Sequence, residues 1–331
     1  MSGSAMEATV KALLAPGKGL LAADESFPTI EKRFREFGIP STDQTRQAYR
    51  EMLFTTPGLA EFISGVILFD ETIRQKIADV PMPEALDKLG IIPGIKVDKG
   101  TMSLPCFTGE KITQGLDGLR ERLAEYRKLG ARFTKWRALI VIGDQTPTHS
   151  CMAANARALA LFAALSQEVE LVPIIEPEIL MDGDHSLARC EEATSETLEH
   201  VFHALLEYRV GLEQMLLKTN MIVSGTEHAE QAGPVEVAKA TLRCFRRSVP
   251  VAVPGIVFLS GGQSDEAATE RLSAICAEAN SSWKFSFSFG RALQTPALKV
   301  WKGISSNMPA AQDALHRRAH LNSVALRGGG I

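Results

Sequence analysis

The chain has 331 residues, of which 45% are apolar and 23% charged, and its net charge is −3. These values are typical of a globular protein, and the slight acidity argues against a nucleic acid or an anionic membrane as the main partner. The five cysteines include no C-x-x-C pair, which argues against a disulfide framework or a zinc ribbon and indicates a reducing compartment.

The N-terminal sequence MSGSAMEATVKALLAPGKG contains one short apolar run, residues 12–15, before Pro16. This run is too short for the core of a signal peptide, and no later apolar stretch is long enough to cross a membrane. We therefore expect a cytoplasmic protein whose first element is a helix at about residues 6–15.

Eight short apolar runs follow in chain order. Continuous apolar character, rather than strict alternation, is typical of parallel strands that are covered on both faces. The runs are GLLAAD (19–24), SGVILFD (64–70), IIPGIKVD (91–98), FTKWRALI (133–140), LVPIIEPEI (171–179), MLLKTNM (215–221), VPGIVFLSGG (253–262) and KFSFSFG (284–290).

Helical patterns lie between these runs, the clearest at 116–129, 187–208, 234–247 and 265–279. The alternation predicts an α/β protein with a (β/α)8 TIM barrel as a single domain over residues 1–331, ending in a short Gly-rich segment at 328–331. The alternative is a doubly wound open sheet. That fold would place glycines after its first strand, whereas in APGKGLLAAD they precede it.

Charged residues gather at the carboxyl ends of the runs, which meet at one face of a barrel and form its active site. A residue that only marks the end of a strand needs to be polar but can be of any type. The observed set is instead rich in lysine, arginine and carboxylates: Asp24 and Glu25, Lys96 and Asp98, Lys135 and Arg137, Glu176 and Glu178, Lys218, and Arg291.

Lys218 ends the apolar part of MLLKTNM, and for a lone lysine the simpler interpretation is a strand end with its ammonium in water. Crowded by Lys135 and Arg137 in a partly desolvated cavity, the same lysine would be a neutral amine nucleophile. Such an amine forms an iminium with a ketone, which allows the neighbouring C–C bond to break. Glu176 or Glu178 is then the candidate acid that expels water, and Asp24 the candidate base.

Two loops are candidates for holding a phosphate. FLSGGQS and FGRAL, after the seventh and eighth runs, offer backbone N–H groups and an arginine, as the corresponding loops of barrels often do. Lys32 and Arg33 are candidates for a second phosphate, although EKRFREF is equally an ordinary helix face. None of the seven histidines has a ligand spacing tied to a strand end, so we expect no metal and no cofactor.

Eight motifs together resemble the class I, Schiff-base family of fructose-bisphosphate aldolases, from about residue 14 to about residue 325. They are LLAADES, GVILFDET, GIKVDKG, TKWR, EPEIL-x-DGDH, LLK-x-NM, FLSGGQS and FSFGRALQ. The resemblance implies metal-independent, reversible cleavage of fructose 1,6-bisphosphate to dihydroxyacetone phosphate and glyceraldehyde 3-phosphate. It also implies a homotetramer that works in glycolysis, gluconeogenesis or the Calvin cycle.

The resemblance implies a role for each candidate residue. Lys218 would form the imine, Glu176 would dehydrate the carbinolamine, and Asp24 would deprotonate the C4 hydroxyl. Lys135 would assist at the same centre, and Glu178 would support that charge network. The C1 phosphate would be held by Ser260, Gly261, Gly290 and Arg291, and the other end of the sugar, with its C6 phosphate, by Lys96, Arg137, Ser26, Lys32 and Arg33.

Three features differ from the usual family pattern. Thr219 follows the lysine where proline is common, and Phe27 and Pro28 replace smaller residues. The sequence ends in RGGGI, without the terminal tyrosine that assists proton exchange on the enamine in familiar eukaryotic members. We therefore expect slower exchange in this protein.

Two other functions stay open from the residues alone. One is another Schiff-base barrel enzyme, such as a transaldolase or deoxyribose-phosphate aldolase, and the two sets of phosphate-binding candidates argue against it. The other is a non-catalytic scaffold that kept the fold. The joint presence of Lys218, Glu176, Asp24 and Lys135 argues against a scaffold.

Overall fold

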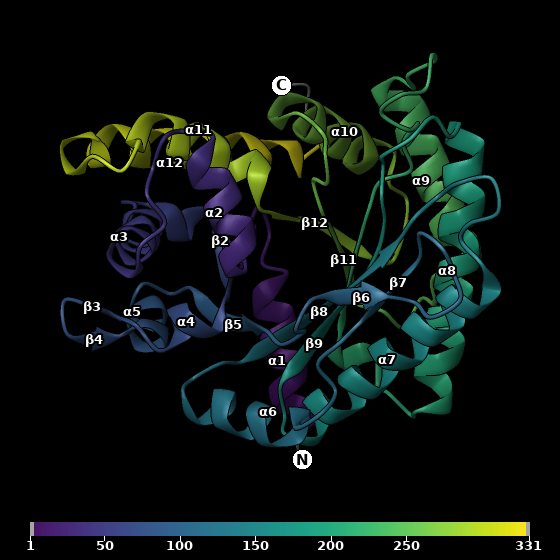
Figure 1. Cartoon of the computed structure of the whole chain (residues 1–331), viewed down its shortest axis with the longest axis horizontal. Coiled ribbons are helices and arrows are strands. Elements are labelled where there is room, and N and C mark those ends of the chain that lie inside the picture. Colours follow the sequence, from purple (N-terminus) through teal and green to yellow (C-terminus); the bar gives the residue numbers. More distant parts are fainter. Residues whose placement is uncertain (1–2, 329–331) are drawn as a thin grey trace.

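Eight parallel strands close into a barrel in the computed structural model, which describes residues 3–328 (Figure 1). Their order around the barrel is β1-β12-β11-β10-β9-β8-β5-β2. Barrel strands that follow one another along the chain are therefore also neighbours in the barrel. The predicted (β/α)8 TIM barrel is confirmed. Its strands are β1 (Gly19–Ala22), β2 (Ile63–Leu68), β5 (Ile92–Lys96), β8 (Phe133–Ile140), β9 (Val172–Ile179), β10 (Leu216–Thr219), β11 (Gly255–Phe258) and β12 (Lys284–Phe289).

Helices lie between the successive barrel strands and cover the outside of the barrel (Figure 1). The four predicted segments correspond to α6 (Leu119–Lys128), α8 (Leu187–Glu207), α9 (Pro234–Ser248) and α10 (Asp265–Glu278). None of the described helices is long and apolar enough to cross a membrane. The others are α2 (Phe27–Arg35), α3 (Asp43–Phe54), α4 (Asp70–Ile73), α5 (Met82–Lys88), α7 (His149–Glu168), α11 (Arg291–Trp301) and α12 (Met308–Ala325), with 3-10 turns η1 (Leu59–Glu61), η2 (Leu212–Gln214) and η3 (Ser305–Asn307).

Two short hairpins were not predicted from the sequence. They are β3 (Lys76–Ile77) with β4 (Val80–Pro81), and β6 (Thr101–Ser103) with β7 (Lys111–Thr113). Strands this short carry too few residues for an alternating pattern to be visible in the sequence. The β6–β7 hairpin leaves the carboxyl end of β5 and therefore lies beside the mouth of the barrel.

Helix α1 (Gly3–Leu13) lies across the amino-terminal end of the barrel (Figure 1). It begins and ends slightly earlier than the predicted 6–15. Its earlier end is consistent with Pro16, which disfavours helical geometry at the residue before it. Its side chains share one buried apolar cluster with inward-facing strand residues, so they plug this end of the barrel. The cluster contains Met6, Val10, Leu13, Leu14, Leu20, Ala22, Ile67, Ile92, Phe133, Val172, Ile174, Leu216 and Val257. Most of the predicted Gly-rich end, residues 329–331, lies outside the described residues.

The inner faces of β8, β9 and β10 change from apolar to charged along their length. On β9, Val172 and Ile174 belong to the apolar plug, and Glu176 and Glu178 follow on the same face because side chains alternate with a period of two. On β8, Phe133 lies in the plug and Lys135, two residues later, lines the cavity; on β10, Leu216 and Lys218 have the same arrangement. The barrel therefore has an apolar floor and a charged mouth.

Glycines on the inner faces make room for the apolar floor. A Cβ atom on Gly94 would lie 2.3 Å from the ring of Phe133, and one on Gly255 would lie 2.5 Å from Leu14 Cδ1. Both distances are too short for any real Cβ contact. The Phe133 ring is fully buried in the barrel interior, and a Cβ atom on Gly94 would lie within 2.5 Å of three of its ring atoms, so Gly94 is a demanding position.

We predict that Gly94→Ala lowers the free energy of unfolding by about 1–3 kcal/mol, since an added methyl group overpacks the barrel interior. Urea-induced unfolding measures this change. Gly211→Ala is the matched control, because its φ is −71° and its added Cβ would be 3.4 Å from the nearest atom. We expect the control to be neutral or slightly stabilising. An equal loss in both variants would contradict the role of the Phe133 contact.

Candidate active site

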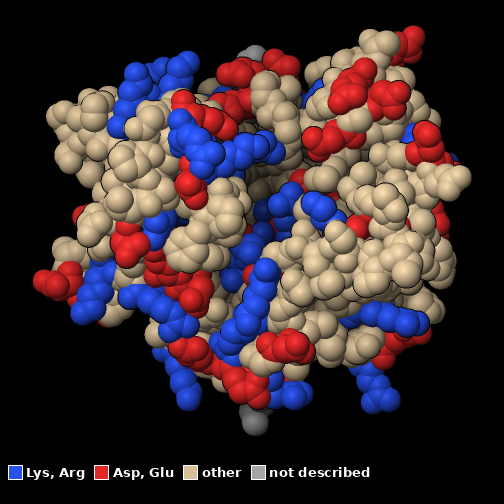
Figure 2. Space-filling model, viewed as in Figure 1, with Lys and Arg blue, Asp and Glu red and all other residues tan. Residues whose placement is uncertain are grey.

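A cavity of about 280 Å³ opens at the carboxyl ends of the barrel strands. It lies in the hollow that Figure 2 shows surrounded by lysine and arginine side chains. Thirteen of the fourteen candidate site residues line it: Asp24, Ser26, Arg33, Lys96, Lys135, Arg137, Glu176, Glu178, Lys218, Ser260, Gly261, Gly290 and Arg291. The barrel thus brings together residues spread over most of the chain.

The remaining candidate, Lys32, lies outside the lining of the cavity. Its side chain is exposed on α2, whereas its neighbour Arg33 is half-buried and lines the cavity. Successive residues of a helix project about 100° apart, so one helix cannot direct both side chains into the same space. The sequence pattern left the two residues equivalent, and the orientation of α2 separates them.

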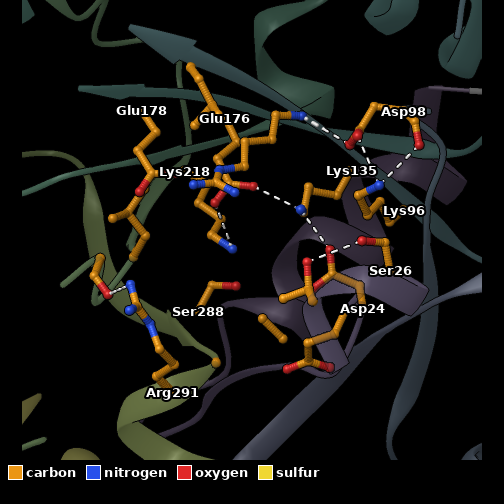
Figure 3. A pocket seen from close by; sticks show the side chains of 18 of the residues that line it. Asp24, Ser26, Lys96, Asp98, Lys135, Glu176, Glu178, Lys218, Ser288 and Arg291 are labelled. Atoms are coloured by element: carbon orange, nitrogen blue, oxygen red, sulfur yellow. Dashed lines mark hydrogen bonds and ion pairs between the residues drawn. The ribbon is translucent and has the colours of Figure 1, made fainter. Parts of the chain in front are cut away.

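The central feature is a row of alternating charges across the mouth of the barrel (Figure 3). Lys135 Nζ lies 2.6 Å from Asp24 Oδ2 and 3.0 Å from Glu176 Oε2. Lys218 Nζ lies 2.9 Å from Glu176 Oε1. The sequence analysis expected Lys135 and Arg137 near Lys218 and a glutamate as the acid. In the structure the carboxylate of Glu176 lies between the two lysines, because buried like charges need a counter-charge.

The row also sets the protonation of its members. Burial by itself would raise the pKa of Asp24, but Lys135 and Lys218 outweigh it and hold that pKa well below its ordinary value. Burial would also raise the pKa of Glu176, but the cations Lys135, Lys218 and Arg137 outweigh burial and lower it. Burial would lower the pKa of Lys135, but Asp24 and Glu176 raise it. Both carboxylates are therefore ionised at neutral pH, and Lys135 is protonated.

Further ion pairs flank the row. Lys96 Nζ lies 2.8 Å from Asp98 Oδ1, and Arg137 donates to Glu178. Burial would lower the pKa of Arg137, but Glu178 and Glu176 raise it. These pairs hold two more cations at the cavity wall in fixed positions.

The cavity also contains residues to which the sequence analysis gave no role. Asp98, Thr101 and Ser288 line it. The Ser288 hydroxyl is buried on β12 with no hydrogen-bond partner among the described residues, and Figure 3 shows it directed into the cavity. The signal was present in KFSFSFG, where serine alternates with phenylalanine and the serines can share the inner face.

Two loops, one after β11 and one before α11, line one side of the cavity. Ser260 and Gly261 follow β11, and Gly261 has a φ of +56°, a conformation that favours glycine. Arg291 begins α11 and donates to the backbone oxygen of Gly261. Burial, together with the nearby Arg33, lowers the pKa of Arg291. The guanidinium groups of Arg33 and Arg291, beside the N-terminus of α11, form a site that suits a phosphate.

The first turn of α2 contributes two hydroxyl groups. Ser26 Oγ and Thr29 Oγ1 lie 3.1 Å apart, and both residues line the cavity. Ser26 is the N-cap of α2 but its side chain makes no capping hydrogen bond.

Among residues 3–328, no group of three or more His, Cys, Asp or Glu side chains is arranged to hold a metal ion.

Comparisons with known proteins agree with one another. The family model described as fructose-bisphosphate aldolase class-I matches residues 5–329. A protein of Xanthomonas campestris pv. campestris named "Probable fructose-bisphosphate aldolase class 1" is 52% identical over 99% of both chains. "Fructose-bisphosphate aldolase 6, cytosolic" of Arabidopsis thaliana is 49% identical over 95% of this chain and 88% of its own length. A solved structure of the Plasmodium falciparum fructose-bisphosphate aldolase, in complex with TRAP and an inhibitor, has a TM-score of 0.97 at 47% identity, covering 99% of this chain and 96% of that one.

We predict that Lys135→Met raises the pKa of Asp24, because burial is then opposed mainly by the more distant Lys218. Carbon-13 NMR titration of the Asp24 carboxyl group measures this change. Lys96→Met is the matched control, and it should raise the same pKa less, since Lys96 is the weakest of the three lysines that act on Asp24.

The same variant should change how stability depends on pH. The pKa of Asp24 is lower in the folded protein than its ordinary value of 3.8. Ionised Asp24 therefore stabilises the fold at pH values above 3.8, and this stabilisation is lost as the pH falls towards the pKa of the folded state. Lys135→Met should therefore lose stability at neutral pH, and the difference from the wild type should shrink below about pH 4. A difference that does not change with pH would contradict the charge row.

Proposed function

The chain belongs to the class I fructose-bisphosphate aldolase family, and on that premise we propose that Lys218 is the amine that forms a Schiff base with the substrate. Members of the family are metal-independent lyases that cleave fructose 1,6-bisphosphate reversibly to dihydroxyacetone phosphate and glyceraldehyde 3-phosphate, and this protein is such an aldolase. The observation that carries the role of Lys218 is its position. Its buried amine lies 2.9 Å from Glu176 on the inner wall of the barrel.

Glu176 is the proposed acid and base for imine formation. Because Lys135 and Lys218 outweigh burial, its carboxylate is ionised before the substrate binds. It can therefore accept one proton from Nζ, so that the amine attacks the C2 carbonyl carbon, and a second N–H proton then passes to the C2 oxygen to give the hydroxyl group of the carbinolamine. Glu176 returns its proton to that hydroxyl group, which leaves as water, and the iminium forms.

Asp24 is the proposed base for the cleavage step. Its ionised carboxylate removes the proton of the C4 hydroxyl group, and the C3–C4 bond breaks as the C4 carbonyl forms. The bond's electron pair moves into the iminium to give an enamine, and glyceraldehyde 3-phosphate leaves. Lys135 contacts both Asp24 and Glu176, so it keeps the two carboxylates ionised and apart. Protonation and hydrolysis of the enamine release dihydroxyacetone phosphate and restore the amine.

The two phosphates are assigned to two sets of residues that line the cavity. Ser260, Gly261, Gly290 and Arg291 are proposed to hold the C1 phosphate. Lys96, Arg137, Ser26 and Arg33 are proposed to position the other end of the sugar, with Glu178 holding Arg137 in place. Lys32 is exposed beside the cavity, so we assign it long-range attraction of the anionic substrate only.

The setting of the enzyme is proposed by analogy. A cytoplasmic location is supported by the word "cytosolic" in the name of the Arabidopsis thaliana relative. The homotetramer, and the place in glycolysis, gluconeogenesis or the Calvin cycle, rest on the family resemblance. Light scattering by the purified chain measures the number of copies in the particle.

We predict that borohydride traps dihydroxyacetone phosphate on Lys218 in the presence of excess EDTA. Reduction of the iminium leaves a stable secondary amine, and peptide mass mapping identifies the modified residue. Lys218→Arg is the control and should give no adduct at this position. A folded wild-type protein without an adduct, or with an adduct on Lys135 instead, would contradict the assignment.

We predict that Glu176→Gln lowers kcat by about 10²-fold or more, because an amide cannot carry the proton from the amine to the departing hydroxyl group. A coupled assay of fructose 1,6-bisphosphate cleavage measures this loss. Glu191→Gln is a matched control, since Glu191 pairs with Arg243 on α8 and α9, away from the cavity. If both variants keep wild-type kcat, Glu176 does not have this role.

A further inference from the structure

We propose that Glu25 is a positioning residue, which holds Arg33 at the wall of the cavity so that the guanidinium group is ready to bind a substrate phosphate. The proposal rests on the function proposed above for the cavity. Glu25 follows Asp24 at the end of β1 and lines the cavity. Its side chain is only 3% exposed, and a carboxylate this deeply buried is stable only when it is paired.

The partners of Glu25 come from three different helices. Oε1 accepts from Nη1 of Arg33 on α2 and, at 3.0 Å, from Nε2 of Gln294 on α11. Oε2 lies 2.7 Å from Nη2 of Arg50 on α3, in an ion pair whose angles are not those of a hydrogen bond. Burial would raise the pKa of Glu25, but Arg33 and Arg50 lower it. The carboxylate is therefore ionised and ties α2, α3 and α11 together.

Gln294 fixes the carboxylate in turn. Its Nε2 donates to the backbone oxygen of Ala22 at 2.6 Å, and its Oε1 accepts from the hydroxyl group of Tyr49 at 3.0 Å. Both Gln294 and Tyr49 are fully buried. Glu25 is thus held from behind by the core, and only the contact with Arg33 faces the cavity.

Arg33 is the member of this cluster that a ligand can reach. Its side chain is 20% exposed and lines the cavity, whereas that of Arg50 is 4% exposed and does not. Arg33 Nη2 would lie 3.8 Å from a Cβ atom on Gly290, so it is close to the loop that carries Arg291. Arg33 and Arg50 together carry two positive charges, and Glu25 neutralises only one of them. The remaining positive charge is available to an anion at Arg33, because Arg33 is the arginine that lines the cavity.

The contact with Glu25 matters because arginine has a long and flexible side chain. A free guanidinium group would lose rotamer entropy when it binds a phosphate, whereas one that is already held loses little. Its planar donors can then meet the phosphate oxygens in a fixed geometry. Among the described residues, Glu25 has its side-chain hydrogen bonds and ion pairs with Arg33, Arg50 and Gln294 and not with Asp24, Lys135 or Glu176. Its removal should therefore weaken substrate binding and leave the chemical steps intact.

The test is the steady-state cleavage of fructose 1,6-bisphosphate by Glu25→Gln. The amide keeps the size of the side chain and removes its charge. We expect KM to rise about tenfold and kcat to stay within about twofold of the wild type, since preorganisation acts on binding here. Glu25→Asp, which keeps the charge but withdraws it from Arg33, should raise KM by a smaller factor. It keeps the proposal testable if Glu25→Gln does not fold.

A double-mutant cycle separates positioning from a general structural role. In an Arg33→Ala background, Glu25→Gln should change KM by less than about twofold, because no guanidinium group is left to position. Glu71→Gln is the matched control. It breaks the pair with Arg46 on α3, which has a distance of 2.6 Å and is partly buried, and neither residue lines the cavity. KM should be unchanged in this control.

Two results would overturn the proposal while the wild type remains active. One is an unchanged KM in Glu25→Gln or, if that variant does not fold, in Glu25→Asp. The other is a rise in KM that is equally large with and without Arg33. A wild-type protein that fails to cleave fructose 1,6-bisphosphate would instead overturn the proposed function itself, so the two failures are distinguishable.

Discussion

The mouth of the barrel depends on one constraint, which is that buried charges must be paired. Removing a single ion from water costs several kcal/mol, and the mutual attraction of close partners has to offset this. The row Asp24–Lys135–Glu176–Lys218 meets the constraint by alternation, since each internal member contacts an opposite charge on both sides. The same constraint explains why Lys96, Arg137 and Arg33 each have a carboxylate partner in the cavity wall.

The floor of the barrel supports this arrangement. Helix α1 and the apolar halves of the strands fill the amino-terminal end, and glycines such as Gly94 give Phe133 the space it needs. Because the floor is dry and close-packed, the strands that carry Lys135, Glu176 and Lys218 have little freedom to shift. The precise placement of the charged residues is therefore a consequence of apolar packing below them, and a defect in the floor should disturb the mouth.

Much of this architecture was predictable from the sequence, because it depends on local periodicity. The eight apolar runs correspond to the eight barrel strands, and thirteen of the fourteen candidate residues line one cavity. The β3–β4 and β6–β7 hairpins were missed because strands of two or three residues carry no periodic signal. The roles of Asp98 and Ser288 were missed for a different reason, since a polar residue at a strand end does not reveal whether a partner satisfies it.

The sequence by itself determined the order of strands and helices and the set of charged residues at the strand ends, because continuous apolar runs, helical periodicity and the polar residues that end each run are all local patterns. Only the tertiary structure decided which charges are partners. Asp24 and Lys135 are far apart in the chain, and their 2.6 Å contact exists only because the barrel closes. Closure likewise placed Glu176 between two lysines, turned Arg33 towards the cavity and Lys32 towards solvent, and gave Glu25 its two arginines. Such pairings depend on distances in space, which a pattern along the chain does not contain.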